Sequence, residues 1–272
     1  MSGEHRVDKI AFSNILYTET MEQTSSHHTP PRKFAAFDID GTLFRSGLYR
    51  ELATEIMQRG IIDQRLVDNA QHKLTQWKKR NGKNSYNEYE QSLLNALDTS
   101  LPSVPTEVYD AAAEKIVTEQ LDNVYTYTRA ELARLSREGY FLIAISGSQQ
   151  ELVRPFAEKY GFDAWIGQRY VRENGHFTGE IIKTYTGKDV LLQSIVNEYN
   201  LSYTDSYAYG DSQGDQGMLH LVEHPVAFNP TVELLEIAEK QGWTIVVERK
   251  SVVYKLEKGS HGLFILAEAG KI

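Results

Sequence analysis

The sequence predicts an α/β fold: a Rossmann-like, doubly wound parallel sheet with an all-helical segment inserted after the first strand. Residues 34–44, FAAFDIDGTLF, begin with an apolar run that has the length of a buried strand. Residues 46–125 instead repeat apolar side chains at helical spacing and contain no convincing strand. Beyond Gly139, short apolar runs alternate with helical segments, which implies parallel pairing of the strands. We therefore expect a mobile tail (1–33), a core domain (34–45 and 126–272) and a helical insert (46–125).

Composition and charge restrict the classes of protein to which the chain can belong. Its 272 residues, 41% of them hydrophobic, suffice for a large α/β core with a smaller second domain. The chain has no cysteine, which excludes disulfides, thiolate metal sites and a cysteine nucleophile, and suits a reducing, cytoplasmic location. A formal charge of −8 argues against a nucleic-acid partner, because binding along a polynucleotide needs a basic surface.

The first 33 residues are polar and contain no apolar stretch of the length that a signal peptide needs, so we expect them to form the mobile tail. No apolar run in the chain approaches the roughly 20 residues of a membrane span, so no membrane partner is expected. The sequence leaves open whether the protein acts as a monomer or as a homodimer.

The helical insert is expected to contain four helices. Apolar residues recur three or four positions apart in four successive segments, around Leu48–Ile56, Leu66–Trp77, Tyr86–Leu97 and Val108–Ile116. Gly60 and Asn81-Gly82 offer stops between them, and Pro105 offers a start. A fifth helix, over about 126–138, ends at Gly139 and leads back to the strands.

The second half of the chain alternates between strands and helices. Strands are expected at 140–146, at AWIG (164–167), in a hairpin over 168–182 that turns at Asn174-Gly175, and at 206–210, 225–228 and 243–248. Helices are expected from about 150 to Gly161, from Lys188 to about Tyr199, near Met218, and over 231–240. Ligands of such sheets bind beyond the carboxyl ends of the strands.

Four polar clusters follow predicted strands or begin the helices after them. They are Asp38 and Asp40, Ser146-Gly147-Ser148, Gly187-Lys188, and the segment GDSQGD with Asp211 and Asp215. A parallel sheet gathers all four clusters at one edge. Because four neighbouring carboxylates repel one another, we expect Asp38, Asp40, Asp211 and Asp215 to surround a divalent cation with oxygen ligands, most simply Mg²⁺.

The same clusters predict a phosphate site. The hydroxyl of Ser146, the main-chain amide at Gly147 and the ammonium of Lys188 form a cradle for a tetrahedral oxyanion, which a phosphoryl group fits. Asp38, kept ionised by Lys188 and the metal, is then a usable nucleophile toward phosphorus. Asp40 is placed to protonate the leaving alkoxide and later to deprotonate the attacking water.

Four segments, DIDGTLF, AISGS, TGKDV and YGDSQGD, resemble the four motifs of the haloacid dehalogenase superfamily in order and approximate spacing. The helical insert and the segment SGSQQELVRPFAEKYGFD are similar to the helical cap and the corresponding segment of its phosphoserine phosphatase-like branch. The resemblance covers residues 34 to about 250 and implies a phosphatase acting on a small phosphorylated metabolite. It further implies Asp38 as nucleophile, Asp40 as acid/base and main-chain metal ligand, Thr42, Ser146 and Lys188 as phosphate contacts, and Asp211 as a Mg²⁺ ligand supported by Asp215.

Two features bear on the reaction and the substrate. True dehalogenases of the superfamily lack an acid at the position of Asp40, so the chain looks like a phosphotransfer enzyme. Phosphoserine phosphatases usually carry a glutamate about nine residues after the nucleophile to hold the substrate's amino group, and here that residue is Gly47. Candidate specificity residues in the insert are Arg45, Tyr49, Arg50 and Trp77.

The sequence argues against several other kinds of site. The aspartate segments do not match a calcium-binding EF-hand loop, because Thr42 and Val222 stand where ligands are required. The glycines of 210–217 lack dinucleotide-fingerprint spacing, and Asp189 after Gly187-Lys188 argues against a phosphate-binding P-loop. A phosphomutase or phosphotransferase that uses the same aspartyl-phosphate, and a non-catalytic phosphate-binding protein on the same fold, remain open.

Overall fold

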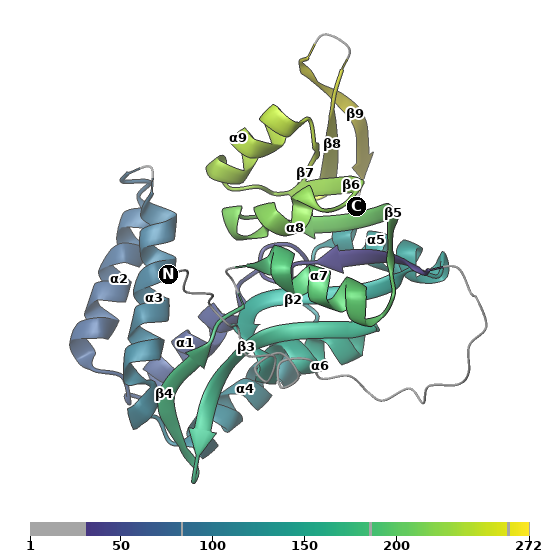
Figure 1. The fold of residues 1–272 in the computed structure, drawn as a ribbon. Helices are drawn as coiled ribbons and strands as arrows, with labels where there is room; N and C mark the ends of the chain where they lie inside the picture. The colour runs from purple at the N-terminus through teal and green to yellow at the C-terminus, as the bar shows by residue number, and fades with distance from the viewer. Residues whose placement is uncertain (1–30, 83, 185–186, 260–261, 272) are drawn as a thin grey trace, which may run out of the picture.

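A computed structural model describes residues 31–82, 84–184, 187–259 and 262–271. Within these residues, nine strands form one sheet in the order β4-β3-β2-β1-β5-β6-β7-β8-β9 (Figure 1). Most of the expected N-terminal tail, residues 1–30, lies outside the described residues. No helix of the described residues is both long enough and apolar enough to span a membrane.

The centre of the sheet is parallel, which confirms the predicted α/β class. Its strands, in spatial order, are β3 (Ala164–Glu173), β2 (Phe141–Gln149), β1 (Lys33–Phe37), β5 (Ser202–Gly210), β6 (His224–Phe228) and β7 (Thr244–Arg249). The first strand, β1, lies in the middle of the sheet, and later strands are added on both sides of it. The carboxyl ends of β1, β2 and β5 are therefore adjacent.

Helices cover both faces of the sheet, and β1 shows how the two cores are divided. Ala35 and Phe37 belong to one buried apolar cluster, and Phe34 and Ala36 belong to the other, because successive strand side chains point to opposite faces. The first face is covered by α5 (Thr126–Arg137) and α6 (Gln150–Tyr160). The second is covered by α7 (Lys188–Glu198), α8 (Gln216–His220), which follows the short η2 (Gln213–Asp215), and α9 (Val232–Gln241).

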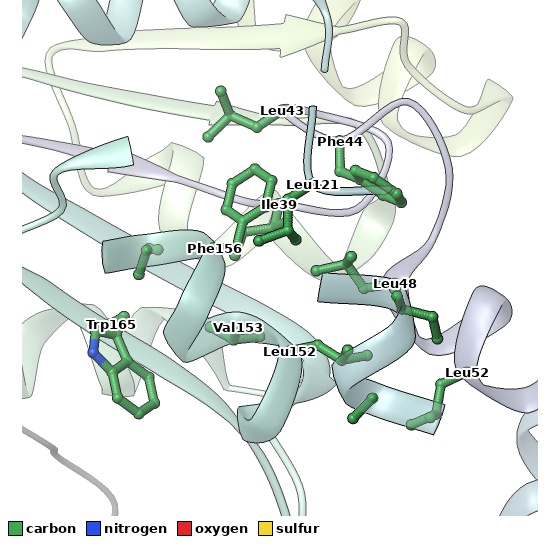
Figure 2. Packing of buried hydrophobic residues seen from close by; sticks show 14 of the residues in the cluster. Ile39, Leu43, Phe44, Leu48, Leu52, Leu121, Leu152, Val153, Phe156 and Trp165 are labelled. Atoms are coloured by element: carbon green, nitrogen blue, oxygen red, sulfur yellow. The ribbon is translucent and has the colours of Figure 1, made fainter. Parts of the chain in front are cut away.

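The insert between β1 and α5 is helical, as predicted. It contains α1 (Leu48–Gln58), α2 (Gln64–Lys78), α3 (Ser85–Ser100), the short η1 (Leu101–Ser103) and α4 (Thr106–Gln120). In Figure 1, α2 and α3 lie side by side and project away from the sheet. Leu48 and Leu52 of α1 are fully buried and belong to the same apolar cluster as Leu152 and Phe156 of α6, so this cluster joins the insert to the sheet (Figure 2).

The predicted hairpin is present and makes a second connection with the insert. Strand β4 (His176–Ile182) pairs antiparallel with β3 across a turn at Asn174-Gly175, where both residues have positive φ, 51° and 77°. The buried hydroxyl of Tyr170 on β3 donates a hydrogen bond to Asp98 of α3 at 2.6 Å. The Thr106 hydroxyl at the start of α4 donates to the Gly175 carbonyl at 2.8 Å.

Two features of the sheet differ from the expectation. AWIG and the first half of the hairpin form one continuous strand, β3, rather than two pieces. In addition, β8 (Val252–Lys258) and β9 (Phe264–Lys271) extend the sheet as an antiparallel hairpin that the sequence did not predict. Strand β9 is largely exposed, and β8 is half-buried along most of its length, so neither strand shows the alternation of buried and exposed residues that marks a strand with one buried face.

Candidate active site

The predicted polar clusters meet at the carboxyl edge of the parallel sheet. Strand β1 ends at Phe37, which pairs with Ala144 of β2 and with Tyr209 of β5. The residues that follow these positions, Asp38, Ser146 and Asp211, therefore emerge side by side. Lys188 joins them from the first position of α7.

Lys188 holds two of the carboxylates together. Its Nζ donates to Asp38 Oδ1 at 2.7 Å and to Asp215 Oδ1 at 2.6 Å, and all three side chains are buried. Burial by itself lowers the pKa of Lys188, but the charges of Asp215 and Asp38 outweigh it and raise that pKa above its usual value. The ammonium is thus charged and fixed beside Asp38.

Asp38, Asp211 and Asp215 form a group of oxygen donors that fits a metal ion. One carboxylate oxygen from each lies within 4.8 Å of the other two. Asp38 Oδ2 is buried and has no hydrogen-bond partner among the described residues. A hard divalent cation satisfies such an oxygen and offsets the repulsion within the group.

The three aspartates are not equivalent. Both oxygens of Asp215 are already engaged: Oδ1 by Lys188, and Oδ2 by the main-chain N–H groups of Asp211 and Ser212, at 3.1 and 3.0 Å. Among the described residues, Asp38 Oδ2 and the Asp211 carboxylate have no such partners, and both side chains line the cavity. This arrangement suits direct metal contact by Asp38 and Asp211 and a supporting role for Asp215.

Burial is the largest influence on the pKa values of Asp38 and Asp211. Burial raises the pKa of Asp38 to about 8. The positive charge of Lys188 opposes this increase, and the negative charges of Asp215 and Asp40 add to it. Burial, with the charges of Asp38 and Asp215, also raises the pKa of Asp211 well above its usual value. A bound cation therefore favours the ionised state of both.

Asp40 lies between the insert and the sheet. Its Oδ1 accepts the Leu48 main-chain N–H at 2.6 Å, and its Oδ2 accepts the Ser146 hydroxyl at 2.9 Å. Gly47, at the N-cap of α1, has no side chain with which to cap the helix, so Asp40 supplies this acceptor from outside it. Burial raises the pKa of Asp40, which favours a carboxyl group that can hold a proton.

The predicted phosphate contacts occupy different positions. Lys188 and Gly147 line the cavity that contains the aspartates, and the Ser146 hydroxyl is directed at Asp40. Thr42 is fully buried, and its hydroxyl has no hydrogen-bond partner among the described residues. Thr42 lies outside the cavity lining, so its contact with phosphate stays a prediction from the sequence.

Gly41 has a role that sequence reasoning missed. Its φ is +81°, and a Cβ at this position would lie 2.0 Å from Asp211 Oδ2. Only glycine allows the loop after β1 to approach the Asp211 carboxylate so closely. The position of Gly41 directly after the two aspartates in DIDGT was the feature of the sequence that could have indicated this close approach.

The cavity has a volume of about 480 Å³ and extends from the aspartates to the insert. This size suits a small metabolite. Of the expected specificity residues, Arg45, Tyr49 and Arg50 line it. Trp77 does not line it, and instead stacks on Tyr89 with ring centroids 5.6 Å apart.

Helix α3 contributes wall residues that sequence reasoning did not select. Tyr86, Asn87, Glu90 and Gln91 line the cavity. Tyr86 and Glu90 are four positions apart and so share a helix face. That spacing was visible in the sequence, but it could not show that this face meets the cavity.

Comparisons with known proteins agree with this fold. The family model for haloacid dehalogenase-like hydrolases matches residues 35–220, and the chain belongs to this family. It is 24% identical over 230 residues to a histidinol-phosphatase of Neisseria meningitidis serogroup C, covering 79% of this chain and 98% of that protein.

Proteins named as phosphoserine phosphatases are among the relatives and the solved structures that match the chain. The chain is 31% identical over 140 residues to phosphoserine phosphatase SerB1 of Mycobacterium tuberculosis, covering 50% of this chain and 45% of that protein. A solved structure described as a phospho-aspartyl intermediate analogue of phosphoserine phosphatase shares the fold, with a TM-score of 0.56 and 20% identity over 81% of this chain and 95% of that chain.

Proposed function

We propose that this protein is a Mg²⁺-dependent phosphatase that hydrolyses a small phosphomonoester through an aspartyl-phosphate intermediate. The proposal rests on the different contacts of the two oxygens of the Asp38 carboxylate. Lys188 holds one oxygen at 2.7 Å, whereas the other is buried without a hydrogen-bond partner among the described residues. Asp38 also lines the cavity, so Lys188 orients this carboxylate at the place where we expect the substrate to bind.

In the first half-reaction, an oxygen of Asp38 attacks phosphorus, and the bond between phosphorus and the ester oxygen breaks. Asp40 donates its proton to the departing alkoxide, which leaves as the alcohol. The raised pKa of Asp40 supports this role, because a buried carboxyl retains a proton more readily than an exposed one. The hydrogen bonds from Leu48 and Ser146 fix the orientation of the carboxyl group.

In the second half-reaction, Asp40 removes a proton from water, and the water oxygen attacks the phosphorus of the aspartyl-phosphate. The bond between phosphorus and Asp38 breaks and releases phosphate, which regenerates the carboxylate. Lys188 and the amide at Gly147 are assigned to the phosphoryl oxygens, where they offset negative charge. The Ser146 hydroxyl donates to Asp40 in this structure and would have to turn away from it to join them, as the resemblance implies. Mg²⁺, held by Asp38, Asp211 and the Asp40 main-chain carbonyl with Asp215 in support, supplies further neutralisation of that charge.

The insert is proposed to act as a cap, with residues 46–125 closing over a core of 34–45 and 126–272. Residues of the insert, among them Tyr49, Arg50 and Glu90, line the cavity together with the aspartates, so we expect the insert to exclude water and to select the alcohol portion of the substrate. The relatives named as histidinol-phosphatase and phosphoserine phosphatase support a small phosphorylated metabolite. A cytoplasmic location, expected from the absence of cysteine, is part of the same proposal.

The test is phosphate release from a panel of phosphomonoesters with Mg²⁺, with EDTA, and with Asp38→Asn protein. We expect release that depends on the metal and is lost in Asp38→Asn. Asp68→Asn, on the exposed side of α2, is the matched control and should behave as wild type. Phosphorylation of an added alcohol in place of phosphate release would instead indicate a phosphotransferase, and absence of turnover despite metal binding would indicate a binding protein.

A further inference from the structure

A buried carboxylate outside the cavity binds both chain segments that connect the insert to the rest of the protein. Glu248 lies on β7, and only 1% of its side chain is exposed. Its Oε1 accepts the Arg45 Nη2–H at 2.6 Å, where the chain enters the insert. Its two oxygens also accept the main-chain N–H groups of Thr126 and Tyr127, at 3.2 and 2.9 Å, where the chain leaves it. Glu248 lies beyond the part of the chain that the family model matches.

These two linking segments also bind each other. The Arg45 N–H donates to the Asn123 carbonyl, and the Tyr125 N–H donates to the Leu43 carbonyl, both at 2.8 Å. Helix α5 begins directly after Tyr125, whose side chain does not cap it, so Glu248 supplies an acceptor for the N–H groups of the first turn. The helix dipole also favours a negative charge at this end. Glu248 therefore fixes both segments to the sheet.

Arg45 connects this carboxylate to the cavity. Arg45 lines the cavity, whereas Glu248 is not among the lining residues. Arg45 Nε donates to the Val124 carbonyl at 2.8 Å, and its guanidinium carbon lies 5.0 Å from the centre of the Tyr125 ring. Among the described residues, Nη1 of the same guanidinium has no hydrogen-bond partner. Arg45 is thus a donor at the cavity wall that Glu248 and Val124 hold on two sides.

The main chain of Glu248 holds a third residue of the cavity. Its N–H donates to Asn229 Oδ1 at 2.9 Å, and the Asn229 N–H donates to the Val246 carbonyl at 2.8 Å. Asn229 has a φ of +42°, so these bonds stabilise a conformation that is uncommon for a residue other than glycine. Asn229 also interacts with Tyr125, because it opposes the increase that burial causes in the pKa of Tyr125. Arg45, Tyr125 and Asn229 together form one wall of the cavity, the linker wall.

We propose that Glu248 is a positioning residue, which holds the linker wall in place so that it binds the alcohol portion of the substrate. This inference rests on the proposed phosphatase function. The three wall residues come from segments far apart in the sequence, and Glu248 is the group that joins them. Stability alone gives little reason for such a group, because apolar residues of similar volume often stabilise a protein as well as a buried ion pair does. Loss of its charge should therefore weaken substrate binding more than it slows the chemical steps.

The experiment compares esters that differ in the size of the alcohol portion. O-phosphoserine, histidinol phosphate and phenyl phosphate carry larger alcohol portions, whereas methyl phosphate carries a single methyl group. For the best of the three larger esters, Glu248→Gln should raise KM about 10-fold and leave kcat within about threefold, because a hydrogen bond to a charged group is lost. The KM of methyl phosphate should stay within about twofold of wild type. An equal change for all four esters would indicate a merely structural role and overturn the proposal.

A double-mutant cycle tests whether Glu248 acts through Arg45. Arg45→Met removes the guanidinium and keeps an unbranched side chain, and it should raise the KM of the larger ester about 10-fold or more. The double variant Arg45→Met/Glu248→Gln should be no more than about twofold worse than Arg45→Met, because no guanidinium is left to position. Increases in KM that multiply would show that the two residues act independently, which contradicts the proposal.

Glu257→Gln is the matched control. It makes the same change on the neighbouring strand β8, where Glu257 pairs with Lys255 at 2.8 Å and lines no part of the cavity that contains the aspartates. This variant should keep the wild-type KM for all four esters. Thermal melting checks the folding of each variant. Arg45→Met leaves Glu248 bound by main-chain N–H groups, so an unchanged KM in this variant overturns the proposal even where Glu248→Gln proves unstable.

Binding separates this inference from the proposed function. Calorimetry with the same four esters on Asp38→Asn protein should give about 10-fold weaker binding of the best larger ester when Glu248→Gln is added. If wild type releases no phosphate from any ester, the phosphatase proposal fails and the calorimetry still tests the linker wall. If esters are hydrolysed but Glu248→Gln leaves the binding of the larger esters unchanged, the inference alone is overturned. Absence of both hydrolysis and binding for all four esters would overturn both.

Discussion

Asp40 accepts a hydrogen bond from the main-chain N–H of Leu48 at 2.6 Å, and this contact joins the site to the first residue of α1. The neighbouring Tyr49 N–H donates to Ser148 Oγ at 2.8 Å, so the sheet edge caps α1 twice. A shift of α1 therefore changes the position of the Asp40 carboxyl group. In the proposed mechanism, a movement of the cap therefore also moves the acid/base residue, Asp40.

Asp40→Asn is expected to slow turnover by about 10²- to 10⁴-fold, because no proton reaches the leaving alkoxide and none is taken from water. The amide retains an acceptor for the Leu48 N–H, so the melting temperature should change little. Mass spectrometry after rapid quenching should detect phosphorylated enzyme if the second half-reaction is slowed more than the first. A steady-state rate equal to that of wild type contradicts the acid/base role.

Gly41→Ala is expected to destabilise the protein and to weaken Mg²⁺ binding. The new methyl group adds backbone strain of about 1–3 kcal/mol at positive φ and also displaces the Asp211 carboxylate. Gly139→Ala is the matched control, since Gly139 has the same φ of +81° with no atom within 4 Å of its Cβ position. Urea unfolding and Mg²⁺ titration measure the difference; equal effects of the two substitutions would exclude the contact with Asp211.

The stability of the metal-free protein should fall as pH rises from about 4 to about 8. Burial raises the pKa of Asp38 from 3.8 to about 8, so the folded state binds more protons than the unfolded state in this interval. Stability then decreases with rising pH, because deprotonation costs more in the folded state. Melting curves in EDTA should show a smaller decrease in melting temperature between pH 4 and pH 8 for Asp38→Asn than for wild type. Addition of Mg²⁺ to the wild-type protein at pH 7 should raise its melting temperature again. Parallel curves for the two proteins would contradict a raised pKa of Asp38.

Tyr170→Phe is expected to destabilise the protein by about 1–3 kcal/mol, because the substitution removes a buried hydrogen bond and leaves polar partners unsatisfied. The Tyr170 hydroxyl donates to Asp98 and accepts from Gln149 Nε2 at 3.1 Å, so it connects the hairpin, α3 and β2. Tyr254→Phe, at an exposed position on β8, is the control. Urea unfolding of both variants measures the difference, and equal stability would show that this link contributes nothing.

Local sequence patterns were sufficient for the fold class. The helices of the insert bury residues such as Leu48 and Leu52 on one face, and helical periodicity reports that burial directly. The strands of the parallel centre are buried on both sides and appear as apolar runs. The β8–β9 hairpin escaped prediction because β9 is largely exposed and β8 is half-buried along most of its length, so neither strand alternates between buried and exposed residues.

One break in the predicted strands has a specific cause. Gly167 ended the expected strand AWIG, but β3 continues through it. A Cβ at this position would lie 2.9 Å from Gln150 Cα, so glycine is required where the start of α6 crosses the strand. This contact joins segments 17 residues apart and leaves no signal in the local pattern.

By itself, the sequence determined that Asp38, Ser146, Lys188 and Asp211 belong to one edge of a parallel sheet, because that edge is set by strand order and direction. Only the tertiary structure decided which carboxylate oxygens of the aspartates are left for a metal ion. Lys188 binds one oxygen of Asp38 and one of Asp215, and these residues are far apart in the sequence. The tertiary structure alone also decided that Glu90 lines the cavity while Trp77 lies outside it. Both residues sit on helices of the insert, and the packing of those helices against α1 and the sheet fixes which face meets the site.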